Sequence, residues 1–174
     1  MVVTSTPAAW PGALPQHIHK RYGGNPITLQ LGDKLYHRRL FVGGIDHQPE
    51  TRPDVDVVLN LGEKPSRWAP SANTLQDRWA VKGEGSQGMG LDEIVEEVQW
   101  VIEQLRAGQR VLVHCVAGFN RSVTLCCATL ILLEKLSAEA ALQRVQVQHR
   151  WAQPDAHHWL ALRWLAHQFA SRVD

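Results

Sequence analysis

The sequence predicts an α/β fold, in which one domain holds a central, mostly parallel sheet of four to five strands flanked by helices. Its length of 174 residues is close to the roughly 150 typical of a single domain. Short apolar segments separated by turn residues fill the first half of the chain, and longer segments with helical periodicity fill the second half. Between them a short apolar strand leads through a loop into a helix, as in α/β layers.

Strands are predicted where short segments rich in β-branched residues and leucine end at turn residues. Residues 1–26 are rich in Pro, Gly, Ala and Thr without a steady period, so we expect a loose segment there and a folded domain over residues 27–174. The predicted strands are residues 27–31, 34–42 (ending at Gly43 and Gly44) and 55–61, with a shorter candidate at 78–81. The nearly continuous apolar run over 55–61 is typical of a strand covered on both faces.

Helical periodicity begins at Leu91. Apolar residues recur at Leu91, Ile94, Val95, Val98, Ile102 and Leu105, and the glutamates Glu93, Glu96, Glu97 and Glu103 lie largely off that face. This pattern predicts an amphipathic helix that stops at Gly108. A buried strand over 111–113 follows. Three further helices are expected over about 121–133, over 137–150, opened by Ser137, and from 154 or 155 to 172.

Composition and charge exclude several classes of protein. The chain has 18 Lys and Arg against 17 Asp and Glu, a net charge of +1, so no polybasic surface for nucleic acid is predicted. Three cysteines, Cys115, Cys126 and Cys127, argue against a disulfide framework and for a reducing compartment, and the adjacent pair is expected to fill apolar space. The N-terminus lacks the pattern of a secretory signal, and the longest apolar run, residues 125–133, is far shorter than the roughly 20 residues that span a bilayer. We therefore expect a soluble, cytoplasmic protein without a nucleic-acid or membrane partner.

The loop after the buried strand carries the chemistry. The strand delivers Cys115 to the carboxyl edge of the sheet, and the following backbone N–H groups, up to Arg121 at the start of a helix, are able to converge on one anion. Gly118 permits a positive φ or a close backbone approach. Arg121 is suited to bidentate binding of phosphate oxygens. A cysteine thiolate beneath a bound phosphate is a positioned nucleophile.

Residues 114–122, HCVAGFNRS, match the pattern H-C-x-x-G-x-x-R-S. In this motif the chain resembles the cysteine-dependent protein tyrosine phosphatases, and among them the compact dual-specificity branch. Residues 40–44, 57–61 and 141–154 are similar to that branch in type and order. The resemblance implies Cys115 as the nucleophile that forms a phosphocysteine, Arg121 as the binder of phosphate and transition state, Ser122 as the hydroxyl that helps the thiolate leave, and His114 as an orienting residue. Asn60 is expected to brace the loop. The expected substrate-binding residues are Val116, Ala117, Gly118, Phe119, Asn120 and Arg121, whose backbone N–H groups are able to converge on one anion. The Phe119 ring is expected at the lip of the pocket, where it would suit the aromatic ring of phosphotyrosine.

The chain departs from the family at the general acid. Such phosphatases place an Asp on a loop before the long helix, and aligning residues 79–87 with that loop puts Gly85 at the expected position. Glu84 is adjacent, carries a carboxylate and is surrounded by glycines that would let the loop move. Glu84 is therefore the predicted acid, with Asp92 and Asp77 as alternatives.

The predicted function is hydrolysis of phosphotyrosine in proteins, with phosphoserine and phosphothreonine as further candidate substrates. The partner is accordingly a phosphorylated protein or peptide, and the chemistry needs no cofactor and no metal. The adjacent His157 and His158 point to different helix faces and lack ligands at suitable spacing, which argues against a metal site. Because the usual Asp is missing, the alternative is a phosphate-recognising binding module with weak or no turnover.

Overall fold

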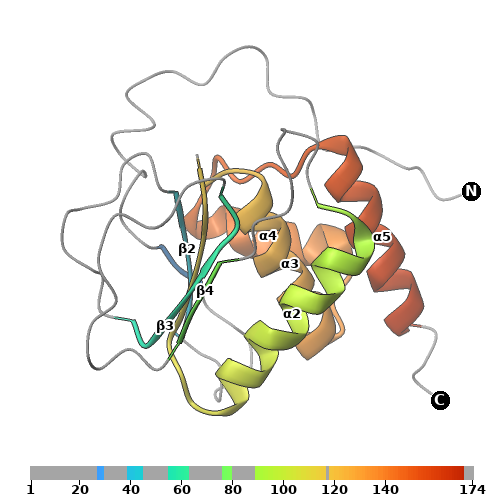
Figure 1. Ribbon diagram of the computed structural model, residues 1–174. Helices are drawn as coiled ribbons and strands as arrows, with labels where there is room; N and C mark the ends of the chain where they lie inside the picture. The colour runs from blue at the N-terminus through green and yellow to red at the C-terminus, as the bar shows by residue number, and fades with distance from the viewer. Residues whose placement is uncertain are drawn as a thin grey trace, which may run out of the picture.

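The strands form one sheet in the order β1-β2-β5-β3-β4 (Figure 1). The computed structural model describes residues 27–29, 39–44, 55–62, 76–79, 89–116 and 118–170. Within these ranges the strands are β1 Ile27–Leu29, β2 Leu40–Gly44, β3 Val57–Asn60, β4 Gln76–Trp79 and β5 Val111–Cys115. The three central strands β2, β5 and β3 and the edge strand β4 pair in parallel, whereas β1 pairs with β2 antiparallel. The predicted α/β fold with a mostly parallel sheet is confirmed.

Some predicted boundaries lie outside the described residues, and others differ from the observed ones by one or two residues. Residues 1–26 and residues 30–38 are outside the described ranges, so the domain start at residue 27 stays a prediction. The fourth strand begins at residue 76, two residues before the predicted start, because its parallel pairing with β3 runs from Val57 opposite Gln76 to Asn60 opposite Trp79. The polar residues Gln76 and Asp77 hid this start from a pattern search for apolar residues.

The described helices are α2 Leu91–Arg106, α3 Arg121–Glu134, α4 Ala138–Gln148 and α5 Ala156–Ala170. All four lie on the same side of the sheet (Figure 1). Their ends follow the predicted signals: Ser137 Oγ accepts a hydrogen bond from Ala140 N at 3.1 Å, and Gly108, with a φ of +84°, follows the end of α2. The four helices predicted after residue 90 are confirmed.

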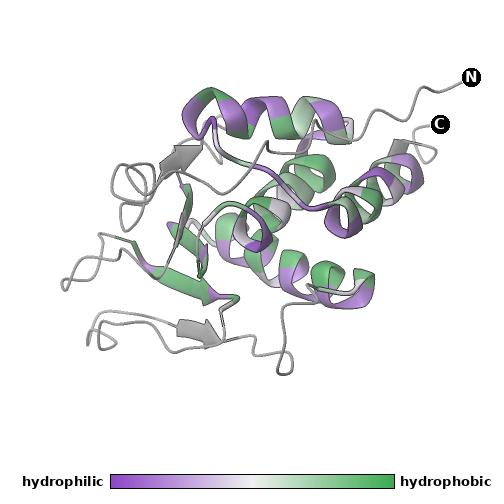
Figure 2. Cartoon of the chain, turned by 90° about the horizontal axis from the view of Figure 1, so that it is seen from above, coloured by the Kyte–Doolittle hydropathy of each residue, from purple (hydrophilic) through white to green (hydrophobic). Residues whose placement is uncertain are grey.

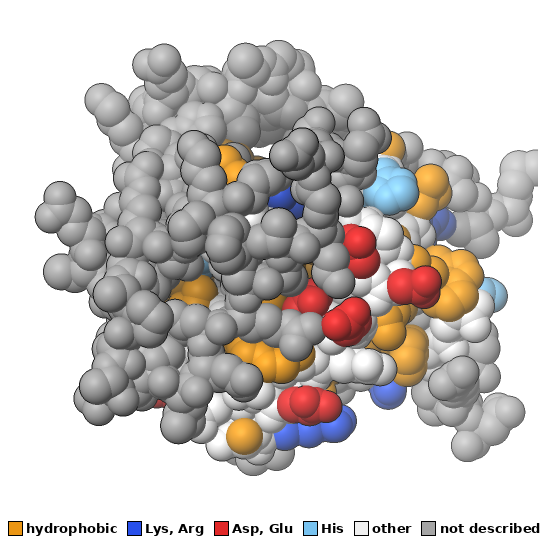
Figure 3. Space-filling view, viewed as in Figure 1, with side chains coloured by type: hydrophobic (Ala, Val, Ile, Leu, Met, Phe, Trp, Pro, Cys, Tyr) orange, Lys and Arg blue, Asp and Glu red, His pale blue; other side chains and the backbone are white. Residues whose placement is uncertain are grey.

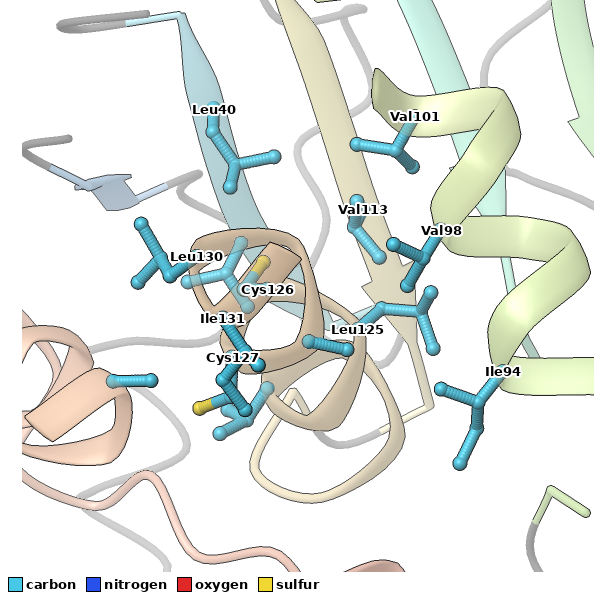
Figure 4. Close-up of a cluster of buried hydrophobic side chains, with 14 of the residues drawn as sticks. Leu40, Ile94, Val98, Val101, Val113, Leu125, Cys126, Cys127, Leu130 and Ile131 are labelled. Atoms are coloured by element: carbon cyan, nitrogen blue, oxygen red, sulfur yellow. The ribbon is translucent and has the colours of Figure 1, made fainter. Parts of the chain in front are cut away.

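Helix α3 occupies the middle of the helical layer. Each residue from Ser122 to Ile131 is buried, and hydrophobic positions concentrate where the helices face the sheet and one another (Figure 2). Leu40 and Val113 of the sheet meet Ile94 and Val98 of α2 and the side chains of α3 in one core (Figure 4). No helix in the described ranges is both long and apolar enough to cross a membrane.

Cys126 and Cys127 lie in this core, as predicted for small apolar side chains. Both are 0 % exposed, and Figure 4 shows them among the aliphatic side chains of α3. Burial raises the pKa of both thiols. They therefore stay protonated and unreactive.

The outer face of α2 is acidic, but one glutamate of this helix is buried. Acidic side chains gather over this helix in the space-filling view (Figure 3), where Asp92, Glu96 and Glu103 are exposed. Glu97, which the sequence pattern placed off the apolar face, is only 1 % exposed. It follows Ile94 by three residues and precedes Val101 by four, a spacing that puts it on the flank of the buried stripe.

The opposite face of the sheet carries a smaller apolar cluster formed by Val55, Val58 and Leu112, with Phe41 packed against it. Val58 and Leu112 are each 1 % exposed. The central strands are thus buried on both faces, as their continuous apolar sequences predict.

Candidate active site

Strand β5, in the middle of the sheet, ends at Cys115, and a loop leads from its carboxyl end into α3. The parallel register sets Gly44 of β2 beside Cys115 and Asn60 of β3 beside His114. Residues 118–120 lead into α3, which begins at Arg121. We refer to residues 115–121 as the 115–121 loop. Ala117 lies outside the described residues.

The sulfur of Cys115 is held by two groups of the loop and of α3. Ser122 Oγ lies 3.3 Å from Sγ, and the Gly118 N–H donates to Sγ at 3.3 Å. The Cys115 side chain is 2 % exposed. Both groups are able to donate a hydrogen bond to a thiolate, which is the nucleophilic form of cysteine.

Gly118 adopts the left-handed conformation that the sequence suggested, with a φ of +83°. Two groups outside the loop hold the next two carbonyls: His149 Nε2 lies 2.8 Å from Gly118 O, and Gln153 N donates to Phe119 O at 2.8 Å. In a trans peptide the N–H points away from the C=O. The N–H groups of Phe119 and Asn120 therefore point away from these anchors, as an anion cradle requires.

The Phe119 ring is buried beside His149. It is 6 % exposed and stacks on His149, with ring centroids 5.4 Å apart. The expectation that this ring is exposed at the lip of a pocket is wrong, because the ring is buried against His149, directly after the end of α4. The backbone N–H of Phe119 keeps its place among the candidate anion donors.

Arg121 is tied to the turn that follows β3. Its Nη1 donates to Leu61 O at 2.9 Å. The same turn is braced by Asn60, whose Oδ1 accepts from Gly62 N at 2.8 Å. A Cβ on Gly62 would lie 3.2 Å from Asn60 Oδ1 and 3.5 Å from Val116 Cγ2, so the turn reaches the 115–121 loop because residue 62 has no side chain. Asn60 thus holds the backbone of Gly62, which lies against Val116 of the 115–121 loop.

His114 is completely buried in the sheet. Its Nδ1 lies 3.4 Å from Cys115 O, and its carbonyl accepts from Leu61 N at 2.8 Å. These contacts link β5 to the turn that holds Arg121.

Asn120 is held by residues that the sequence did not assign to the site. Its Nδ2 donates to Asp155 Oδ2 at 3.1 Å, and its Oδ1 accepts from Asp155 N at 2.8 Å. His158 Nδ1 lies 2.8 Å from the same Oδ1, and His158 Nε2 accepts from Met89 N at 2.9 Å. The contact residues lie 35 and 38 positions from Asn120, and the sequence offered only the observation that His157 and His158 point to different helix faces.

The charges around this network follow from burial and hydrogen bonding. Burial lowers the pKa of His149, partly opposed by its hydrogen bond to Gly118. Burial also lowers the pKa of His158, where Asp155 acts in the opposite direction and His157 and Arg121 lower it further. Burial tends to raise the pKa of Asp155, but the hydrogen bond from His158 N and the neighbouring histidine charge outweigh it, and the net shift is downward. Both imidazoles are therefore predominantly neutral at pH 7.

Of the three candidate acids, the structure describes the side chain of Asp92 alone. Glu84 lies outside the described ranges. Asp92 is exposed in the first turn of α2. Asp77 lies in β4 opposite Val58, two positions before the strand end. In the part of the chain that the structure describes, no group of His, Cys, Asp and Glu is arranged to hold a metal ion.

Comparison with solved structures agrees with the fold of this chain. Human DUSP28 matches with a TM-score of 0.66 at 21% identity, over 86% of this chain and 99% of the other. A mouse protein complexed with zinc tungstate matches with a TM-score of 0.68 at 19% identity, over 95% and 96% of the two chains. PTPMT1, solved in complex with PI(5)P, matches with a TM-score of 0.63 at 18% identity, over 78% and 94%. These identities establish a shared fold.

The family follows from the sequence itself. No curated protein matches the chain significantly. The family model of the dual specificity phosphatase catalytic domain, however, matches residues 43–168, which include all of β5, the 115–121 loop and α3. The chain therefore belongs to the dual specificity phosphatase family.

Proposed function

We propose that the protein is a phosphatase that removes phosphate from phosphotyrosine in proteins, and from phosphoserine or phosphothreonine as further substrates, through a phosphocysteine. The observation that carries the proposal is the position of Cys115 Sγ, 3.3 Å from both Ser122 Oγ and Gly118 N, at the N-terminal end of the helix that begins with Arg121. The nucleophile, the backbone N–H groups that would hold an anion and the guanidinium of Arg121 all belong to one short segment.

The reaction has two steps. In the first, the Cys115 thiolate attacks phosphorus, an S–P bond forms, and the P–O bond to the substrate breaks while Glu84 gives its proton to the leaving oxygen. In the second, water attacks the phosphocysteine, Glu84 takes the proton from that water, and inorganic phosphate and the thiolate are released. Ser122, next to Sγ, donates a hydrogen bond to the departing thiolate. Arg121 and the N–H groups of the 115–121 loop hold the phosphate oxygens in both steps.

The position of Glu84 along the chain supports its assignment as the acid. It lies five residues after Trp79 and five before Met89. At one end, Trp79 closes β4 opposite Asn60, which is itself opposite His114. At the other end, the Met89 backbone is hydrogen-bonded to His158, which contacts the 115–121 loop. Both ends of the segment thus lie near Cys115, and five extended residues reach about 17 Å.

The charge of the loop supports a singly phosphorylated substrate. Between Cys115 and Arg121 the sequence is Val-Ala-Gly-Phe-Asn, with no Lys, Arg or His to meet additional phosphates. A monophosphate on a protein side chain fits this loop better than a polyphosphorylated lipid headgroup. A binding module without turnover would need neither Cys115 nor Ser122, so their contact argues for catalysis.

Steady-state hydrolysis of a phosphotyrosine peptide between pH 5 and 8 tests the proposal. We expect turnover by the wild type, none by Cys115→Ser, and loss of the basic limb of the pH profile in Glu84→Gln. Glu103→Gln, the same change at an exposed position on α2, is the matched control and is expected to behave as the wild type. Binding of the peptide by the wild type without hydrolysis would instead favour the binding module.

Aryl phosphates with different leaving groups test the acid separately. With a working acid, kcat/KM depends weakly on the pKa of the leaving phenol, and Glu84→Gln steepens that dependence. An equally steep dependence in the wild type and in Glu84→Gln would refute the assignment of Glu84 while leaving the nucleophile in place.

A further inference from the structure

His158 connects two parts of the molecule that the reaction requires. It lies on α5 and is 0 % exposed. Its Nδ1 contacts Asn120 of the 115–121 loop at 2.8 Å, and its Nε2 contacts the backbone of Met89 at 2.9 Å. Met89 lies just before α2 and five residues after Glu84.

The hydrogen-bond network fixes the protonation state of His158. The carboxylate of Asp155 accepts from Asn120 Nδ2, and Asp155 N donates to Asn120 Oδ1. Asn120 Oδ1 is thus an acceptor, so His158 Nδ1 must carry the proton. A backbone amide donates to His158 Nε2, so Nε2 must be unprotonated. The geometry is satisfied only by the neutral Nδ1–H tautomer.

We propose that neutral His158 is a positioning residue that joins the 115–121 loop to the amino end of α2, and that it loses the second contact when it takes up a proton. This inference rests on the proposed phosphatase function. An Nε2–H would face the Met89 N–H, and two donors cannot share a hydrogen bond. The contact with Asn120 survives protonation, because Nδ1 stays a donor.

The surroundings of His158 decide where this change occurs. The charged and titratable groups that act on it are Asp155 and His157 on its own segment and Arg121 at the start of α3. Burial lowers the pKa of His158, and His157 and Arg121 lower it further against the attraction of Asp155. The contact with Met89 is therefore intact at neutral pH and is lost only below the ordinary histidine pKa of about 6.5.

Two variants separate the two contacts. In His158→Gln, the side-chain oxygen replaces Nε2 as an acceptor for Met89 N and the donor to Asn120 is lost. In His158→Asn, the side-chain N–H replaces Nδ1 as a donor to Asn120 and the acceptor for Met89 is lost. Neither amide titrates. His167→Gln, at an exposed position later on α5, is the control for the chemical change itself.

The test measures kcat/KM for a phosphotyrosine peptide from pH 4.5 to 8 in the full chain. At pH 7.5 we expect each variant at His158 to lose about 5-fold to 10-fold, the equivalent of one neutral hydrogen bond. The ratio of wild type to His158→Asn should approach one as the pH falls, because protonated wild type and this variant lack the same contact. His167→Gln should follow the wild type throughout. A constant ratio of wild type to His158→Asn across the range would overturn the proposal.

A second readout needs neither turnover nor a variant. In the wild type, the chemical shift of the Met89 amide proton, measured by NMR, should titrate together with the imidazole nitrogens of His158. If the wild type does not hydrolyse the peptide, the proposed function fails, and this titration still decides the role of His158. A Met89 amide that does not respond to His158 protonation refutes it.

Discussion

The contact between His149 and Gly118 makes a quantitative prediction. His149 is 2 % exposed, and its Nε2 is the donor to the Gly118 carbonyl at 2.8 Å, because a carbonyl only accepts. His149→Phe keeps an aromatic ring against Phe119, where the present centroid distance is 5.4 Å, and removes the donor. The change thus isolates one hydrogen bond from the packing around it.

The expected loss follows from the buried acceptor left behind. An unsatisfied buried carbonyl costs about 1–3 kcal/mol. For a domain of this size each kcal/mol corresponds to about 2–4 °C in Tm, so His149→Phe should melt about 2–12 °C below the wild type. The freed Gly118–Phe119 peptide also loses its fixed orientation. A hydrogen bond to a charged group contributes about 1.5–3 kcal/mol, so sulfate should bind roughly 10-fold to 100-fold more weakly.

Thermal unfolding and isothermal titration with sulfate measure the two effects. His149→Gln, whose side-chain N–H is able to reach the same carbonyl, should recover most of both. Equal Tm and equal sulfate affinity in the wild type and in His149→Phe would refute the reasoning. Loss of Tm in His149→Phe without any loss of sulfate affinity would show that this carbonyl anchors the fold and has no influence on the anion cradle.

Three further predictions concern the loop, the core and the pH dependence of stability. Gly118→Ala places a side chain at a φ of +83°, which costs about 1–2 kcal/mol, and it should lower both Tm and kcat/KM for an aryl phosphate. Ile131→Ala, at a fully buried position of α3, should cost about 2–5 kcal/mol in urea denaturation without changing kcat of the folded enzyme. Because the pKa values of His149 and His158 are lowered in the folded state, the unfolded chain takes up protons first as the pH falls below about 6.5. The free energy of unfolding should therefore decrease from pH 6.5 downward until the folded-state pKa values are passed, and His158→Gln should flatten that decrease.

The centre of the site was accessible from the sequence because its determinants are local. A strand buried on both faces, Val111–Cys115, is followed within six residues by Gly118 and Arg121. The positive φ of Gly118 and the start of α3 at Arg121 follow from this short segment alone. Periodicity similarly located α2, since its apolar positions recur over 16 residues.

The outer part of the site was not accessible, because its contacts join distant positions. His149 and Gly118 are 31 residues apart, Arg121 and Leu61 are 60 apart, and Met89 and His158 are 69 apart. No local pattern reports such a pair. A histidine in an apolar helix is most simply interpreted as a packing residue. Its neighbours along the chain do not reveal which backbone group it contacts. The burial of Phe119 was missed for the same reason, since the side chain that covers it comes from the end of α4.

Two buried imidazoles hold the same loop, and protonation affects them differently. His149 uses a donor, and a protonated imidazole still donates, so its contact with Gly118 is insensitive to pH. His158 donates from Nδ1 to Asn120 and accepts at Nε2 from Met89, so protonation of Nε2 removes only the contact with Met89. A change of the Met89 amide shift at low pH that persists in His149→Phe and disappears in His158→Gln therefore assigns the titration to the Met89 contact. A change that disappears in His149→Phe and persists in His158→Gln would contradict this hydrogen-bond geometry.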